Sequence, residues 1–329
     1  LANLKPDLCW KPRQRKLTKP IIDKRVPNPQ RLFDLLSEIG CQDMWEDHFA
    51  ALMPAPLIVD ANNWEEMKPA IFAEIAAGDI TAFDYESSDK DPIKAFRQAA
   101  AAGNRFVDAL SQELAGASFQ FGRHLENVIY VPVDHKDSAN VNKLVILEIL
   151  DYAESCTQLV AHNAHFEGVV TRTNLGKWLT NVEDTRMMQR FYDENIPAGL
   201  KHLSLTYLGF EQTSYEDTLA AANGGLGVNL MCEMTVDEVF KYGTDDSLVT
   251  GHLHDLLRLL LQLDGQWDFY REWAVRPTEV LQRSYVTGCN INWALQRRLH
   301  QADLNTIEAG MKDLRAILLQ NVTGNITAG

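Results

Sequence analysis

The sequence has few cysteines and no long hydrophobic run. Its 329 residues include five cysteines, which are widely scattered, and no pair has the spacing of a zinc finger or a redox motif. We therefore expect reduced thiols in a cytosolic setting. The apolar stretches, such as residues 256–263, are interrupted by charge and fall far short of a bilayer span, and no signal peptide is visible. These absences predict a cytoplasmic protein without a membrane partner.

Positive charge is also scarce over most of the chain. There are 31 Lys and Arg against 45 Asp and Glu, which gives a net charge of −14. Such a balance argues at first against a nucleic-acid partner, because phosphate binding favours basic proteins. Residues 1–31 are the exception, with nine Lys or Arg and two Asp. This segment is either a solvated tail or an arm that contacts phosphate, and the acidic body can still bind nucleic acid through a short, metal-bridged contact.

The order of predicted elements indicates an α/β protein. Residues 1–55 are interpreted as a basic arm followed by a helix. In residues 56–265, a meander of strands is followed by alternating helices and strands, which predicts a mixed central sheet. Residues 266–329 have a helical pattern, and residues 92–115, which are rich in alanine, are expected to form a helical insertion.

The first candidate motif contains Asp84 and Glu86, near the end of a strand predicted over residues 80–86. Residues two apart in a strand face the same side, so the two carboxylates project together. Their mutual repulsion is relieved when they bind a hard cation, which prefers oxygen ligands. The alternative interpretation is an ordinary polar strand end.

The second motif runs from His162 to Glu167. Asn163 follows an apolar strand and can cap the next helix, which places Glu167 in the first turn, where the helix dipole favours a carboxylate. A capped surface helix with an ordinary glutamate is the alternative. His162 and His165 lack a third ligand of suitable spacing, so a structural or substrate-side role is favoured over zinc binding.

The third motif places Tyr242 and Asp246 four residues apart on a long predicted helix, hence on one face. Asp245 is rotated away from that face. An exposed Tyr and Asp pair is the alternative, but the neighbouring Val249 and Leu253 indicate that this side of the helix is partly buried.

The three motifs, in this order, resemble the proofreading 3′-5′ exonuclease domain of family A DNA polymerases, the bacterial polymerase I type. Within the DEDD exonucleases, the tyrosine places the resemblance in the tyrosine subclass. The likeness spans about residues 56–265, including Asp184-Thr185 and Tyr215-Glu216-Asp217, and the form of the second motif is most similar to phage versions. Residues 266–300 resemble the transition into a polymerase region, although no polymerase catalytic motif follows. The family usually has aspartate where this chain has Glu167.

The resemblance implies an RNase H-like exonuclease fold, with a mixed central sheet flanked by helices, an N-terminal arm and C-terminal helices. It implies two divalent ions, Mg²⁺ or Mn²⁺. One would be bound by Asp84, Glu86 and Asp246, and the other by Asp84 with help from Glu167 through water. Tyr242 and Glu86 would orient the attacking water. The residues implied to contact the substrate are Ser87, Asn163, Phe166 and Tyr215.

The first hypothesis is a metal-dependent 3′-5′ exonuclease that removes nucleotides from single-stranded DNA 3′ ends during replication proofreading, with a polymerase region or subunit and other replication proteins as partners. The second is a catalytically weakened exonuclease-fold module that binds DNA or a replication partner. The unusual Glu167 and the predicted insertion favour this second hypothesis. An RNA-processing exonuclease of the same superfamily is a third hypothesis, and comparison of RNA with DNA substrates would separate it from the first.

Overall fold

The computed structural model describes residues 55–95, 97, 107–208, 210–212 and 230–326, with side chains up to residue 319. The predicted basic arm, the first predicted helix and Tyr215 lie outside the described residues. The chain divides into two compact units, Leu1–Val286 and Thr287–Gly329. No described helix combines the length and the apolar character that a membrane span requires.

The first unit is built on a mixed sheet of six strands. Three neighbouring pairs are parallel, β1 with β4, β2 with β5 and β5 with β6, and two are antiparallel, β2 with β3 and β3 with β4. This confirms the prediction of an α/β fold with a mixed central sheet flanked by helices. In spatial order the strands are β1 (Leu57–Ile58), β4 (Asn127–Pro132), β3 (Gln112–Phe121), β2 (Ile80–Asp89), β5 (Gln158–Ala161) and β6 (Glu183–Asp184).

Helices precede, connect and follow the strands. The long helix predicted after the capping-box sequence is confirmed as α11, because Thr235 and Glu238 make the reciprocal bonds of a capping box. The longer helices of this unit are α4 (Trp64–Ala77), α6 (Leu144–Cys156), α7 (Ala164–Leu175), α8 (Thr185–Tyr192), α11 (Val236–Leu263) and α13 (Arg276–Thr287). The short ones are η2 (Ala109–Ser111), α9 (Leu200–Leu203), η3 (Ser204–Leu208), η4 (Met231–Glu233), α12 (Trp267–Tyr270) and η5 (Arg271–Val275). The second unit contains α14 (Trp293–Ile326).

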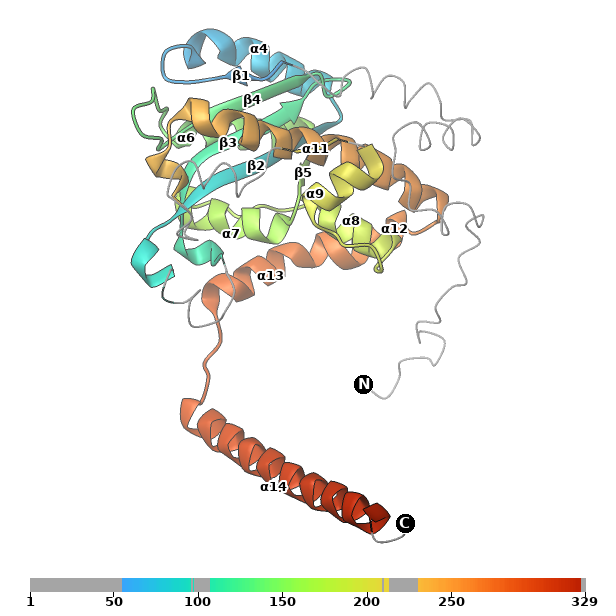
Figure 1. The fold of residues 1–329 in the computed structure, drawn as a ribbon. Helices are drawn as coiled ribbons and strands as arrows, with labels where there is room; N and C mark the ends of the chain where they lie inside the picture. Colours follow the sequence, from blue (N-terminus) through green and yellow to red (C-terminus); the bar gives the residue numbers. More distant parts are fainter. Residues whose placement is uncertain (1–54, 96, 98–106, 209, 213–229, 327–329) are drawn as a thin grey trace. The chain divides into compact units, whose positions relative to one another are not determined.

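The alternation of side chains along β2 divides the sheet into two faces. Phe83 and Tyr85 belong to the main core, which they share with apolar residues of α4, α6 and α7. Asp84 and Glu86 therefore project from the opposite face, because successive residues of a strand point to opposite sides. Helix α11 crosses that opposite face in contact with β2, β3 and β4 (Figure 1). The sheet thus brings the first acidic motif directly beneath the helix that carries the third.

The prediction of a helical insertion over residues 92–115 is wrong at its C-terminal end. Residues 92–95 and 97 are helical, but β3 begins at Gln112 and pairs with Ser87, Ser88 and Asp89 of β2. Alanine has the highest helix propensity, but propensity is a weak determinant, and pairing with a neighbouring strand in a buried sheet overrides it. The two-residue strand β6 has no counterpart among the predicted elements.

Candidate metal and active site

Three carboxylates from two elements form one cluster. One oxygen each of Asp84, Glu86 and Asp246 lie within 4.8 Å of one another. Asp84 and Glu86 come from β2 and Asp246 from α11. In the described part of the chain, no other group of three or more acidic, histidine or cysteine side chains is arranged to hold a metal ion. The first and third sequence motifs are therefore adjacent in space, although 160 residues separate Glu86 from Asp246 along the chain.

The close approach of α11 to the sheet depends on Gly243. A Cβ atom at this position would lie 2.9 Å from Cε2 of Tyr130 and 3.1 Å from Oε1 of Glu86. Both distances are shorter than ordinary contacts between nonbonded atoms. Glycine thus lets the helix backbone lie directly on the ring and on the carboxylate. The glycine between Tyr242 and Asp246 belongs to the construction of the site, a role that the sequence alone did not indicate.

The cluster is electrostatically unfavourable without a cation. Burial and the charge of Asp246 raise the pKa of Asp84 well above its usual range, and burial with the charge of Asp84 does the same for the pKa of Glu86. Burial raises the pKa of Asp246 to about 7, although the nearby Lys201 opposes that rise. Buried acids shift in this way when no opposite charge compensates them. Within the described part of the chain, Oε1 of Glu86 is moreover buried without a hydrogen-bond partner. Oxygen donors in this state fit a hard divalent cation.

Glu167 lies close to the cluster but outside it. It occupies the first turn of α7, as predicted, and its side chain is buried. Its Oε2 has no hydrogen-bond partner among the described residues. Burial raises its pKa well above the usual range, and the charges of Asp84 and Glu86 raise it further. The oxygens of Glu167 are not among the carboxylate oxygens that lie within 4.8 Å of one another. Glu167 therefore lies beside the three-carboxylate group, where it adds negative charge.

The prediction that the side chain of Asn163 caps α7 is wrong. Asn163 does occupy the N-cap position, with a left-handed φ of 74°, but its side chain makes no capping bond. Asp184 performs that role instead, because its two oxygens accept from the backbone N–H groups of Asn163 and Ala164 at 2.9 and 3.0 Å. The same carboxylate accepts from the N–H of Arg186 at 2.9 Å, at the start of α8. One buried aspartate thus fixes the start of the helix that carries Glu167.

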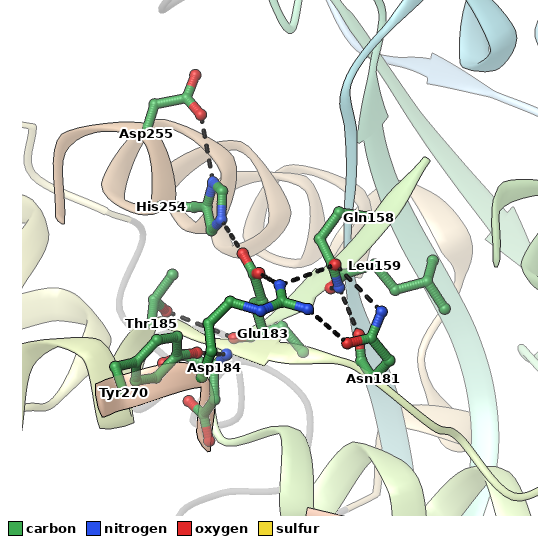
Figure 2. Close-up of polar contacts among 11 residues, drawn as sticks. Gln158, Leu159, Asn181, Glu183, Asp184, Thr185, His254, Asp255 and Tyr270 are labelled. Atoms are coloured by element: carbon green, nitrogen blue, oxygen red, sulfur yellow. Dashed lines mark hydrogen bonds and ion pairs between the residues drawn. The ribbon is translucent and has the colours of Figure 1, made fainter. Parts of the chain in front are cut away.

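A buried polar network holds Asp184 in position. The hydroxyl of Tyr270 accepts from the backbone N–H of Asp184 at 2.7 Å. The neighbouring Glu183 binds both His254 and Arg271, and Figure 2 shows His254 between Glu183 and Asp255. Burial opposes charge on the His254 ring, but the two carboxylates raise its pKa. These contacts connect α11 and the helices after it to the edge strand β6.

The substrate residues implied by the resemblance have different surroundings. Ser87 is buried and its hydroxyl donates to Oε1 of Gln112 at 3.0 Å. Phe166 is partly buried against the main core. His162 forms a hydrogen bond with Thr185, and burial lowers its pKa to about 3. His165 contacts the ring of Tyr285 edge-on, with ring centroids 5.2 Å apart.

Two polar residues at the cluster were not found by sequence reasoning. Lys201 of α9 places its ammonium 5.5 Å from the ring centre of Tyr242 and lowers the pKa of both Glu86 and Asp246. Gln212 donates from its side-chain amide to Oδ1 of Asp246 at 2.5 Å. Neither belongs to a periodic or motif pattern, so only the fold reveals that they meet the cluster.

Part of the chain matches a known protein family. Residues 107–262 match the family model described as a 3′-5′ exonuclease. That match includes the segments that carry Glu167 and Asp246, while β2 precedes it. No curated protein gives a significant sequence match.

Several solved structures are similar to the chain at low identity. NrnC of Brucella melitensis, solved with bound Mg²⁺, is 13% identical, with 73% of this chain and 98% of that chain covered and a TM-score of 0.46. The catalytic core of RRP6 from Trypanosoma brucei is also 13% identical, with 70% and 52% covered and a TM-score of 0.47. RNase D of Escherichia coli, an exoribonuclease involved in structured RNA processing, is 13% identical, with 71% and 51% covered and a TM-score of 0.45.

The family match and the mixed sheet together confirm the expected RNase H-like exonuclease fold. The resemblance to proofreading polymerases is thereby confirmed at the level of the exonuclease domain. Residues 107–262 are therefore similar to 3′-5′ exonuclease domains of the DEDD type.

Proposed function

We propose that this protein is a metal-dependent 3′-5′ exonuclease that removes nucleotides from the 3′ ends of DNA, as in replication proofreading. The observation that carries the proposal is the cluster of Asp84, Glu86 and Asp246, whose oxygens lie within 4.8 Å of one another. The partnerless Oε1 of Glu86 supports it, because a buried acceptor without a donor needs a compensating ligand. The exonuclease family match supports the reaction class.

The proposed ligand sets follow the positions of the four acids. Asp84, Glu86 and Asp246 would hold one Mg²⁺ or Mn²⁺ ion, and Asp84, with help from Glu167 through water, would hold the second. When bound, such ions supply an activated water and stabilise the charge that develops on the phosphate and the leaving oxygen. The four carboxylates by themselves repel a phosphodiester, so the substrate is bound only when cations neutralise the cluster.

Tyr242 is proposed to orient the attacking water together with Glu86. It lies one helical turn before Asp246 and gives that carboxylate a hydrogen bond, which opposes the rise in the pKa of Asp246 that burial causes. An ordinary phenol has a pKa of about 10 and is a poor general base near neutral pH, so orientation is the suitable role. The ammonium of Lys201 over its ring makes this edge of the site attractive to an anionic substrate.

The remaining proposed residues bind the terminal nucleotides. Ser87, Asn163, Phe166 and Tyr215 contact the strand end, and the aromatic rings stack on bases without regard to sequence. Such a site accepts a frayed single-stranded end, so a mismatched terminus is removed faster than a paired one. A polymerase region or subunit is the partner that supplies such ends.

The test is digestion of a 5′-labelled single-stranded DNA with Mg²⁺, with Mn²⁺ and with EDTA. We expect stepwise shortening that requires metal and disappears in Asp246→Ala. Asp245→Ala is the matched control, since this adjacent carboxylate pairs with Lys241 at 3.2 Å and lies outside the cluster. Shortening that survives in Asp246→Ala would refute the assignment of the site. An RNA of the same sequence, run in parallel, decides the substrate: faster shortening of RNA would replace the DNA proposal with an RNA-processing one.

A second candidate function is a weakened exonuclease module that binds DNA or a replication partner. The observation that favours it is the position of Glu167 outside the three-carboxylate group. Glutamate is one methylene longer than the aspartate usual in the resembling family, so its carboxylate reaches a different point. Folded protein that binds DNA without shortening it, and that gains turnover in Glu167→Asp, would establish this second candidate.

A further inference from the structure

Gln212 joins the metal cluster from a segment that carries none of the sequence motifs. It lies 34 residues before Asp246 and is only 8% exposed. Its Nε2 donates to Oδ1 of Asp246 at 2.5 Å. A carboxylate held at one oxygen cannot rotate freely, so this bond restricts the direction in which Asp246 presents its oxygens to Asp84 and Glu86.

The chemistry of an amide suits this position. A lysine or arginine in contact with Asp246 would neutralise the carboxylate and compete with a cation for it. An aspartate or glutamate would add another negative charge to a cluster in which burial and neighbouring carboxylates already raise the pKa of Asp84 and Glu86. A neutral amide donates a hydrogen bond and leaves the charge of the cluster unchanged, so the full negative charge stays available to cations.

The amide oxygen of the same side chain is a second, independent indication that a ligand binds here. Oε1 of Gln212 is buried and has no hydrogen-bond partner among the residues that the structure describes. Buried polar atoms are almost always satisfied, so an unpaired amide oxygen requires an explanation. Two carboxylate oxygens of the site, on Glu86 and Glu167, are buried and unpaired in the same way. A hydrated divalent cation would bring the donors and the positive charge that these three acceptors lack.

We propose that Gln212 is a positioning residue of the metal centre, which fixes the orientation of the Asp246 carboxylate and accepts a hydrogen bond from the hydration of the bound cation. This inference rests on the proposed function in one respect, namely that the three carboxylates bind divalent ions. It extends the site to a residue outside all three acidic motifs. Gln212 acts through Asp246, which makes it a positioning residue.

The test measures metal affinity without nucleic acid. Free Mn²⁺ is followed by electron paramagnetic resonance during titration of the full chain, as wild type and as Gln212→Met, which keeps the side-chain volume but cannot donate. Residues that orient metal ligands change affinity by about 10- to 100-fold when mutated, so the Mn²⁺ dissociation constant is expected to rise by that factor. Half-saturation of nuclease activity by Mn²⁺ should shift by the same factor, and excess Mn²⁺ should restore most of the rate.

Gln189→Met is the matched control. Gln189 is also buried, but its amide donates to the backbone carbonyl of Asp193 at 3.0 Å instead of a carboxylate of the cluster. A merely structural effect would lower the melting temperature of both variants and leave the Mn²⁺ affinity of both unchanged. If Gln212→Met does not fold, Gln212→Asn replaces it, because the shortened amide should not reach Asp246.

The outcomes separate the inference from the proposed function. Wild type that binds Mn²⁺ while Gln212→Met binds it equally well overturns the inference and leaves the exonuclease proposal intact. Weaker binding in Gln212→Met supports the inference even where the wild type shows no nuclease activity. Wild type that binds no Mn²⁺ overturns both.

Discussion

Gly243→Ala tests how closely the site depends on the contact between α11 and the sheet. The added methyl carbon would lie 2.9 Å from Cε2 of Tyr130, and 3.1 and 3.2 Å from Oε1 and Cγ of Glu86. The Tyr130 ring cannot retreat easily, because it is fully buried and its hydroxyl lies 2.6 Å from Nε2 of His135. The strain is therefore relieved by a shift of Glu86 or of the helix that carries Asp246.

The expected effect on stability is small and the effect on activity is large. Adding a methyl group to a packed interior costs about 1–3 kcal/mol. Alanine stabilises a helix by about 1 kcal/mol relative to glycine, which offsets part of this cost. The free energy of unfolding of Gly243→Ala should thus fall by about 0–2 kcal/mol. Misplacement of a catalytic group by about 1 Å costs up to about 100-fold in rate, so kcat/KM should fall by about 10- to 100-fold.

The assay pairs urea unfolding with the rate of DNA shortening at saturating Mg²⁺. Gly310→Ala is the control, since this glycine of α14 is exposed and an added Cβ would meet no atom within 4 Å. That variant should keep wild-type activity. Gly243→Ala with an unchanged rate would refute the reasoning, because Glu86 and Asp246 would then tolerate displacement and could not be closely placed ligands.

Three other perturbations have expected outcomes. Asp246→Asn should abolish shortening and raise the melting temperature measured in EDTA, because it removes one charge from a repelling cluster; a lower melting temperature would contradict this. The pKa of Asp246 is raised in the folded state from 3.8 to about 7, so between about pH 4 and 7 the unfolded chain binds fewer protons than the folded protein. The metal-free protein should therefore lose stability as the pH rises from about 4 to 7. Urea midpoints in EDTA at pH 5 and 8 measure the loss, Mg²⁺ should reverse it at pH 8, and equal midpoints would exclude a strongly raised pKa. Asp184→Ala removes the cap from the first turns of α7 and α8. At about 1–2 kcal/mol for each helix start, the free energy of unfolding measured in urea should fall by about 2–4 kcal/mol. A loss below about 0.5 kcal/mol would show that the caps contribute little.

Local periodicity was sufficient to predict several parts of the site. Alternation along a strand placed Asp84 and Glu86 on one face, and α-helical spacing placed Tyr242 and Asp246 on another. The capping box formed by Thr235 and Glu238 marks the start of α11. These inferences hold because the geometry of a strand or a helix fixes the relation between residues two or four apart, whatever the rest of the chain does.

The tertiary structure alone decided which distant segments meet. It replaced the expected cap from Asn163 with a carboxylate 20 residues further along, converted the end of an alanine-rich segment into β3, and placed Gln212 against Asp246. It also placed Glu167 beside the three-carboxylate group. None of these contacts has a sequence period, because each depends on how the sheet twists and how closely α11 packs on it. Local backbone geometry therefore determined the faces that carry the acids, and the packing of those faces determined which oxygens can share a cation.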